Sequence, residues 1–279
     1  MKKIYPAGSA AEPASKEDAD SRFLQLLNGY RQSLPTDQRD YVDIHFKRFL
    51  CTLRAIPAAR KRGSSAIEVG TYGIFLVALR DLFGYDVIEG TIYERPGVAP
   101  VKLSRRFDFD PKGEYFTLYD IDIEHTQLPV PGQSFDFVLL AEVLEHFATD
   151  PNAFFFEANR VLKLGGRIFV TTPNVTCAEN VFRILWRQVP HRYYYYRRER
   201  TSDRHNLEYG PDLLKKTMEN AGFSVERMWD EDCWCEQRPE ILKLIRYAGF
   251  PDSFRGDDMM FLCVKTGEPQ DRFPDFLYA

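Results

Sequence analysis

The chain has 279 residues, of which 44% are apolar and 28% are charged, and its formal net charge is −4. This length suits one large domain, because single cores stop growing near this size, and the negative charge argues against a general nucleic-acid-binding protein, which needs a basic surface. The five cysteines include no Cys-x-x-Cys pair, no signal peptide is recognisable, and no apolar stretch reaches the ~20 residues of a membrane span, so we expect a cytoplasmic protein with reduced thiols and no membrane partner.

The N-terminal part is predicted to be helical after a short tail. Residues 1–20 are poor in bulky apolar side chains and are expected to form a flexible tail. Within residues 21–62, apolar residues recur at helical spacing from Arg22 to Leu34 and again from Asp37 to Ile56, with Thr36 as the N-cap of the second helix. We expect these two helices to cover the edge of the main sheet or the mouth of the active site.

From residue 63 to residue 279, short apolar runs alternate with helical segments. Seven strands are predicted, at Ser65–Val69, Asp86–Tyr93, Tyr115–Ile121, Phe135–Leu140, Arg167–Thr171, Phe223–Trp229 and Met259–Lys265. Four helices are predicted, at Ile74–Phe83, from Pro151 (after the N-cap Asp150) to a stop at Gly165-Gly166, at Pro211–Ala221 and at Pro239–Tyr247. This alternation predicts an α/β fold with a doubly wound, Rossmann-like, seven-stranded, mostly parallel sheet and helices on both faces.

The alternation is interrupted over residues 175–210. This segment holds Trp186, four consecutive tyrosines from Tyr193 to Tyr196, and many arginines. Its position after the fifth predicted strand indicates an inserted lid over an acceptor site, because ligands bind at the carboxyl ends of the strands in such sheets. Aromatic rings and guanidinium groups would suit a carboxylate, a phosphate or a sugar. A solvated, charged loop that packs on the domain or on a partner chain is the alternative.

A turn with two glycines follows the first predicted strand of the sheet. It belongs to the block Ala66-Ile-Glu-Val-Gly-Thr-Tyr-Gly73. Glycines let a nucleotide-like ligand approach the backbone closely, and the N-terminus of the next helix can face its carboxylate. On its own, this Gly-x-x-Gly pattern fits an ordinary strand-to-helix turn equally well.

Four further blocks decide between these two interpretations. They are Asp122-Ile-Glu-His-Thr-Gln-Leu-Pro129, Phe135-Asp-Phe-Val-Leu-Leu-Ala-Glu-Val-Leu-Glu-His146, Arg160-Val-Leu-Lys-Leu-Gly-Gly166 and Thr172-Pro-Asn174. In this order and spacing the chain resembles the class I S-adenosylmethionine-dependent methyltransferases of the small-molecule type, in the subgroup with a Glu-His motif. The match extends from Ile67 to Asn174, and the segment from His205 to Trp229 fits as well.

The resemblance implies S-adenosyl-L-methionine as cofactor and S-adenosyl-L-homocysteine as product. It assigns the turn after the first strand to the methionine end of the cofactor, Asp122 to the adenine amino group, Ile123 to the adenine ring, and Ala141 with Glu142 to the methyl-transfer site. The residues of the turn are Glu68, Gly70, Thr71, Tyr72 and Gly73. The sequence departs from the family in two places: Tyr72 replaces a glycine, and the acidic residue for the ribose hydroxyls is displaced. Glu89 and Glu94 are its candidates, of which Glu89 is slightly better placed.

The Glu-His motif supplies the candidates for catalysis. We expect Glu142 to line the transfer site and His146 or His205 to act as general base toward the acceptor. The pattern of Glu142, Glu145 and His146 with the later His205 is also similar to the divalent-metal site of O-methyltransferases of ubiquinone biosynthesis and of small-RNA termini. Relatives without a metal carry the same Glu-His pair, where the histidine only packs in the cleft. We therefore expect activity to survive a chelator.

The function that these motifs predict is transfer of a methyl group to a small-molecule acceptor. A hydroxyl oxygen of a sugar or of a secondary metabolite is the expected target, and the arginines of residues 175–210 would accommodate an anionic acceptor. Nitrogen or carbon methylation and a catalytically silent cofactor-binding scaffold are the alternatives. A nicotinamide-dependent reductase would give the Leu-Pro and Glu-His blocks no role. The motifs leave the oligomeric state open.

Overall fold

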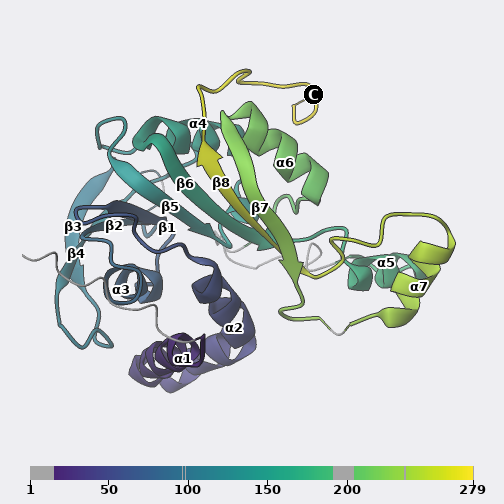
Figure 1. Cartoon of the computed structure of the whole chain (residues 1–279), viewed down its shortest axis with the longest axis horizontal. Coiled ribbons are helices and arrows are strands. Elements are labelled where there is room, and N and C mark those ends of the chain that lie inside the picture. The colour runs from purple at the N-terminus through teal and green to yellow at the C-terminus, as the bar shows by residue number, and fades with distance from the viewer. Residues whose placement is uncertain (1–15, 96, 98, 191–203, 236, 279) are drawn as a thin grey trace, which may run out of the picture.

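An eight-stranded sheet forms the centre of the molecule in the computed structural model (Figure 1), which describes residues 16–95, 97, 99–190, 204–235 and 237–278. The strands are β1 (Ser65–Val69), β2 (Val87–Ile92), β3 (Val101–Arg106), β4 (Tyr115–Asp120), β5 (Phe135–Ala141), β6 (Leu162–Pro173), β7 (Phe223–Glu231) and β8 (Asp258–Lys265). The α-helices are α1 (Lys16–Ser33), α2 (Thr36–Ala55), α3 (Ile74–Asp81), α4 (Pro151–Val161), α5 (Ala178–Leu185), α6 (Pro211–Asn220) and α7 (Pro239–Tyr247). A single 3₁₀ turn, η1 (Leu144–His146), follows β5.

The strand order is β3-β4-β2-β1-β5-β6-β8-β7. The pairs β1·β2, β2·β4, β1·β5 and β5·β6 are parallel, whereas β3·β4, β6·β8 and β7·β8 are antiparallel. The predicted doubly wound, Rossmann-like and mostly parallel sheet is thus confirmed, with eight strands instead of seven. The unpredicted strand is β3, at the edge of the sheet, where its charged and largely solvent-facing sequence Val-Lys-Leu-Ser-Arg-Arg lacks the apolar signal of a buried strand.

Alternating side chains of the central strands pack into two separate hydrophobic clusters, one on each face of the sheet. On β5, Val138 and Leu140 pack in a cluster with residues of α4 and α6. Phe137 and Leu139 point to the other face and pack in a cluster with residues of α1, α2 and α3. Both faces of the sheet are therefore covered by helices, as predicted, and the N-terminal helices lie on the side of α3 (Figure 1).

Most element boundaries differ from the sequence predictions by a few residues, and three of these differences have a clear physical reason. Helix α1 already begins at Lys16, where Glu17 and Asp18 occupy the first turn and favour a helix N-terminus, so only residues 1–15 of the expected tail fall outside the described residues. Thr36 is the first residue of α2, not its cap, because Pro35 precedes it in an extended conformation. Helix α4 keeps its predicted cap, since Asp150 accepts a hydrogen bond from the Ala153 amide.

The end of α4 is the third difference. Gly165-Gly166 was predicted to stop this helix, but α4 ends at Val161 and β6 starts at Leu162, which pairs with Phe135 of β5. A register shift follows on β5, and Gly165 takes a φ of 75° within the strand. The two glycines therefore form an irregularity inside β6 instead of a helix terminus.

Helices α5 and α7 project beside the sheet and share a small cluster of their own (Figure 1). The cluster contains Ala178, Ile241 and Ile245. Helix α5 lies within the predicted lid of residues 175–210, whose central part, residues 191–203 with Tyr193–Tyr196, lies outside the described residues. The lid thus stays a prediction.

The two longest helices are α1 with 18 residues and α2 with 20 residues, and both carry several charged side chains. Within the described ranges, none of the helices has the length and apolar character to span a lipid bilayer.

Candidate active site

A cavity of about 1350 Å³ opens at the carboxyl ends of β1, β2, β4 and β5. It brings together almost all of the predicted site residues, namely Glu68, Gly70, Thr71, Tyr72, Asp122, Ile123, Ala141, Glu142, Glu145, His146 and His205. Gly73 and Glu89 do not line it. This is the edge of an open α/β sheet at which ligands bind, so the predicted motifs converge on one place.

Two glycines shape the turn between β1 and α3. Gly70 has a φ of 71°, and a Cβ atom there would lie 2.7 Å from the side chain of Val143. Gly73 has a φ of 92°, precedes α3 as its N-cap, and would place a Cβ 2.5 Å from the ring of Phe107. Side chains at either position would be strained and would clash. Gly73 thus supports the turn from behind the cavity wall.

Glu68 anchors the same turn from inside the protein. Its buried carboxyl accepts a hydrogen bond of 2.5 Å from the Thr71 hydroxyl, which in turn accepts one of 2.7 Å from the Gly73 amide. Burial raises the pKa of Glu68 to about 8, against the opposing hydrogen bonds from Thr71 and the Leu76 amide. The protonated, uncharged acid is therefore favoured at neutral pH.

Both departures from the family pattern have a place in the cavity wall. Tyr72 is 61% exposed, and its ring centroid lies 5.9 Å from that of Tyr41 on α2, so its side chain turns toward the N-terminal helices. Glu94, just beyond the end of β2, lines the cavity and pairs with Arg105 at 2.8 and 3.0 Å. Glu89 lies within β2, where it accepts a hydrogen bond of 3.1 Å from the Tyr119 hydroxyl. Of the two candidates for the ribose residue, Glu94 lines the cavity, and Glu89, the slightly preferred one, does not.

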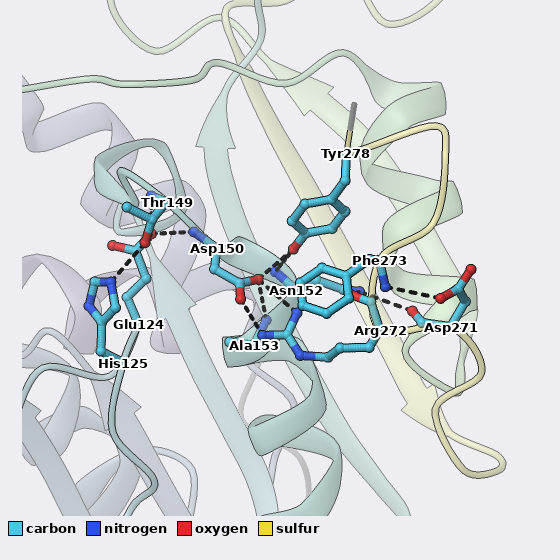
Figure 2. Close-up of polar contacts among 10 residues, drawn as sticks. All are labelled: Glu124, His125, Thr149, Asp150, Asn152, Ala153, Asp271, Arg272, Phe273 and Tyr278. Carbon is cyan, nitrogen blue, oxygen red and sulfur yellow. Dashed lines mark hydrogen bonds and ion pairs between the residues drawn. The ribbon is translucent and has the colours of Figure 1, made fainter.

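The loop after β4 is held by its own side chains. Asp122 accepts a hydrogen bond of 3.1 Å from the Glu124 amide, and its other oxygen lies 3.1 Å from Nδ1 of His125. Glu124 accepts a hydrogen bond from the amide of Ala148. As Figure 2 shows, Glu124 also accepts one from the amide of Thr149, whose hydroxyl lies 2.8 Å from Nε2 of His125. The predicted adenine residue therefore sits on a loop that is tied to the entrance of α4.

The entrance of α4 is tied in turn to the C-terminal segment, as Figure 2 shows. Besides capping the helix, the Asp150 carboxylate accepts hydrogen bonds from the guanidinium of Arg272 and from the hydroxyl of Tyr278. The side-chain amide of Asn152 donates to the carbonyls of Asp271 and Arg272 at 3.2 and 2.8 Å. One chain of polar contacts thus connects the cavity loop with residues 271–278.

Glu142 marks the opposite side of the cavity. It has a φ of 55°, a conformation that costs a non-glycine residue energy and that concentrates at functional sites. Its carboxylate accepts a hydrogen bond of 2.8 Å from the Thr171 hydroxyl and shares another with the buried carboxyl of Asp258. Burial, reinforced by the charge of Glu145, raises the pKa of Glu142 to about 7, although the charge of Arg48 opposes the rise. Burial also raises the pKa of Asp258 well above its usual range, so Asp258 is the protonated partner that donates to Glu142.

Glu145, His146 and His205 form a second group beside Glu142. Their ligand atoms all lie within 4.8 Å of one another, with Nε2 of His146 3.7 Å from Oε1 of Glu145. Nδ1 of His146 lies 3.1 Å from the carbonyl oxygen of Arg204, and Nδ1 of His205 lies 2.8 Å from Oε1 of Glu208. Such outer contacts orient the other nitrogen of each ring, so these three residues could hold a divalent cation. Glu142, part of the predicted set, is not in this group.

The charge of His205 weighs against that use. Burial lowers the pKa of His205, but the carboxylates of Glu208 and Glu145 raise it more, so the net shift is upward. The shift stabilises the protonated ring, which cannot ligate a metal, relative to the neutral ring that can. Glu145 also accepts a hydrogen bond of 3.0 Å from the Thr172 hydroxyl. The group is therefore able to balance its own charges.

Several cavity residues escaped the sequence analysis. Tyr41, His45 and Arg48 come from α2, and Trp234 comes from the loop after β7. Arg48 left a weak signal, because a charged residue seldom interrupts the apolar side of a helix without a purpose. Trp234 showed no such signal in the sequence, apart from the two cysteines that flank it.

A family model described as a methyltransferase domain matches residues 42–227. The chain belongs to this family. It is therefore a methyltransferase of the S-adenosylmethionine-dependent class, with the fold that its motifs predict. No curated protein matches the chain.

Solved structures agree with this fold. One is a chain from the complex between the Trm112 methyltransferase activator of Haloferax volcanii and a methyltransferase. It has 17% identity and a TM-score of 0.52, and the match covers 86% of the present chain and 98% of the Haloferax chain. A SAM-dependent methyltransferase of Thermotoga maritima has 17% identity and a TM-score of 0.51, over 86% and 99%. At this identity, the likeness concerns the fold alone.

Proposed function

We propose that this methyltransferase transfers the methyl group of S-adenosyl-L-methionine to a hydroxyl oxygen of a small molecule, with Glu142 as the proton acceptor. The observation that carries the proposal is the position and acidity of Glu142. It lines the cavity directly after β5, and its pKa of about 7 leaves an ionised fraction available at neutral pH. A general base is most effective when its pKa lies near the working pH.

The size of the cavity supports binding of two molecules. Pockets for one drug-sized ligand measure about 300–1,000 Å³, and this cavity measures about 1350 Å³. On our proposal, the methionine end of the cofactor lies at the turn of Gly70, Thr71 and Tyr72. Asp122 and Ile123 hold the adenine, and Glu94 replaces Glu89 as the residue for the ribose.

The cofactor supplies an activated methyl group, so the residues of the chain have to align the acceptor and remove its proton. Ala141, at the end of β5, and the adjacent Glu142 line the proposed transfer site. The Thr171 hydroxyl orients the Glu142 carboxylate. His205 and His146 lie beside Glu145 and complete the polar side of the site. We assign them to positioning of the acceptor, because both rings already contact other groups of the protein, His146 through Glu145 and the carbonyl of Arg204, and His205 through Glu208.

We propose that the reaction needs no metal ion. The pairing of Glu145, His146 and His205 among themselves and with Glu208 supports this view. The competing view, in which Glu145, His146 and His205 ligate a divalent cation that polarises the acceptor, draws on the same short distances.

Titration of the full chain with S-adenosyl-L-homocysteine in a calorimeter tests the first step of this proposal. Micromolar or tighter binding is expected. Absence of binding would favour the silent scaffold, the alternative that Tyr72 and the displaced ribose residue suggest. Methylation of oxygen, as opposed to nitrogen or carbon, is then tested by mass spectrometry of the products from matched phenol, amine and carbon-acid acceptors.

A further inference from the structure

One face of helix α2 forms a wall of the cavity that the sheet does not supply. Tyr41, Ile44, His45, Arg48 and Phe49 all line the cavity. Their spacing of three or four residues places them on the same side of the helix. The N-terminal helices thus contribute a surface to the cavity.

Four rings make most of this surface, and we call Tyr41, His45, Tyr72 and Trp234 the aromatic wall. The ring centroids of Tyr41 and His45 lie 4.4 Å apart, those of Tyr41 and Tyr72 lie 5.9 Å apart, and those of His45 and Trp234 lie 6.0 Å apart. The indole of Trp234 donates a hydrogen bond of 2.9 Å to Nδ1 of His45, which fixes the imidazole against α2. The wall is therefore continuous and internally braced, as a surface for a flat apolar ligand should be.

Arg48 lies at the inner end of the aromatic wall. It is only 5% exposed, and its guanidinium lies 5.0 Å from the ring of Phe49 and 6.0 Å from that of Trp234. One nitrogen donates a hydrogen bond of 3.0 Å to the Tyr41 hydroxyl, but the buried Nε has no acceptor among the described residues. A buried donor without a partner is costly. Nε itself is closed off from the cavity, but Arg48 lines the cavity, so an oxygen atom of a ligand there can bind another nitrogen of the guanidinium and offset its buried charge.

We infer that this half of the cavity binds a planar aromatic acceptor that bears a hydroxyl group, with its ring against the aromatic wall and its oxygen beside Arg48. This inference rests on the proposed function and names its substrate class. Arg48 and the proposed base Glu142 line the same cavity, and the charge of Arg48 lowers the pKa of Glu142, so an oxygen held by Arg48 lies on the side of the cavity that faces the base. The hydroxyl proton passes to the Glu142 carboxylate, the oxygen bonds to the methyl carbon, and the carbon–sulfur bond breaks. The products are an aryl methyl ether and S-adenosyl-L-homocysteine.

The acidity of the acceptor argues for an aromatic hydroxyl over an aliphatic one. A phenol such as the tyrosine side chain has a pKa of about 10, whereas aliphatic hydroxyls, like water, are far weaker acids. One neighbouring positive charge lowers the pKa of an acid by roughly 1–3 units. Arg48 therefore favours the ionised form of a phenol, against the opposing charge of the Glu142 carboxylate, whereas the same shift leaves the hydroxyl of a sugar far from ionisation.

The test uses the full chain saturated with S-adenosyl-L-homocysteine and 4-nitrophenol as the probe, because the ionised form of this phenol absorbs at longer wavelength. We expect the bound probe to ionise at a lower pH than the free probe. Arg48→Met should abolish this shift and weaken probe binding by at least about tenfold. Arg54→Gln is the matched control, since Arg54 lies on the same helix but pairs with Asp20 outside the cavity. It should leave both quantities unchanged.

Trp234→Leu provides a second variant in case Arg48→Met does not fold. This variant should bind 4-nitrophenol about fivefold or more weakly, but the 4-nitrophenol that does bind should still ionise at a lower pH than the free probe. Tighter binding of benzylamine than of 4-nitrophenol, or equal binding of methyl glucoside, would overturn the aromatic-hydroxyl assignment. So would a spectral shift that survives Arg48→Met. If the wild-type chain does not bind S-adenosyl-L-homocysteine at all, the proposed function fails first, and the two failures are distinguished.

Discussion

The two halves of the cavity are built in different ways. In the cofactor half, the turn of Gly70 to Gly73 and the loop of Asp122 depend on backbone conformation and on contacts between residues close in sequence. In the acceptor half, side chains from distant parts of the chain meet, such as Arg48 of α2, Glu142 after β5 and Asp258 of β8. Local motifs therefore reveal the first half, whereas in the second they reveal Glu142 and the two histidines but neither Arg48 nor Asp258.

The largest effect should come from the acceptor half. We expect Glu142→Gln to lower kcat by about 10²–10⁴-fold, the usual contribution of a general base, and to change the affinity for S-adenosyl-L-homocysteine by less than about threefold. Since the base must be ionised, the wild-type rate should rise as the pH rises through about 7. The variant should lose that rise. Glu219→Gln, on the exposed side of α6, is the control. An unchanged pH profile would exclude Glu142 as the base.

Glu68 is the exception to the backbone character of the cofactor half, and it gives a stability test. Its pKa of about 8 in the folded protein lies above the 4.5 of the unfolded chain. The unfolded state therefore loses the proton first, and the free energy of unfolding should fall as the pH rises from about 4.5 to 8. Glu68→Gln should remove this loss and stabilise the protein at pH 8 by on the order of 3 kcal/mol. Urea unfolding of the protein without cofactor at pH 5 and pH 8 measures both values. Equal pH dependence in the two proteins would contradict the assignment.

The adenine loop should respond only in cofactor binding. We expect Asp122→Ala to weaken binding of S-adenosyl-L-homocysteine by about 1–3 kcal/mol, because the adenine amino group loses its acceptor. Calorimetry measures this change, and 4-nitrophenol binding at saturating cofactor should not move. Asp232→Ala, outside this cavity, serves as control. If Asp122→Ala binds the cofactor normally, the adenine lies elsewhere.

The contacts in Figure 2 predict a change in stability without a large change in the acceptor site. Asp150→Ala removes the cap of α4 and the partner of Arg272 and Tyr278. We expect a loss of about 1–2 kcal/mol in the free energy of unfolding, in the range of helix-cap substitutions. Asp252→Ala, which breaks only an exposed pair with Arg246, should cost less. Equal losses would show that the C-terminal segment adds little.

The smallest effect is expected from metal removal. Prolonged treatment with a chelator should leave turnover unchanged, because Glu145, His146 and His205 pair within the protein. The opposite result would be a loss of turnover that added Mg²⁺ or Mn²⁺ restores in the wild type but not in His146→Ala. That result would show that these residues are metal ligands.

What the sequence reveals follows the same division. Buried strands such as Phe135–Ala141 carry an uninterrupted apolar signal, so the parallel centre of the sheet could be predicted. Strand β3 could not, because an edge strand is stabilised by pairing and needs few apolar side chains. The choice between Glu89 and Glu94 depended on where β2 ends, which is the least predictable property of an element. Arg48 left only a weak signal in the sequence, and its role in the cavity depends on how α2 packs against the sheet.

The placement of β8 has a consequence for how the enzyme is assembled during synthesis. β8 is the last strand in the chain, yet it inserts between β6 and β7 and brings Asp258 to Glu142. A nascent chain that has emerged only as far as α6 already contains the cofactor turn, the adenine loop and the aromatic residues of α2. It still lacks the carboxyl partner of Glu142 and the indole of Trp234. Ribosome-bound intermediates of that length should therefore gain the capacity to recognise the cofactor before they can select an acceptor.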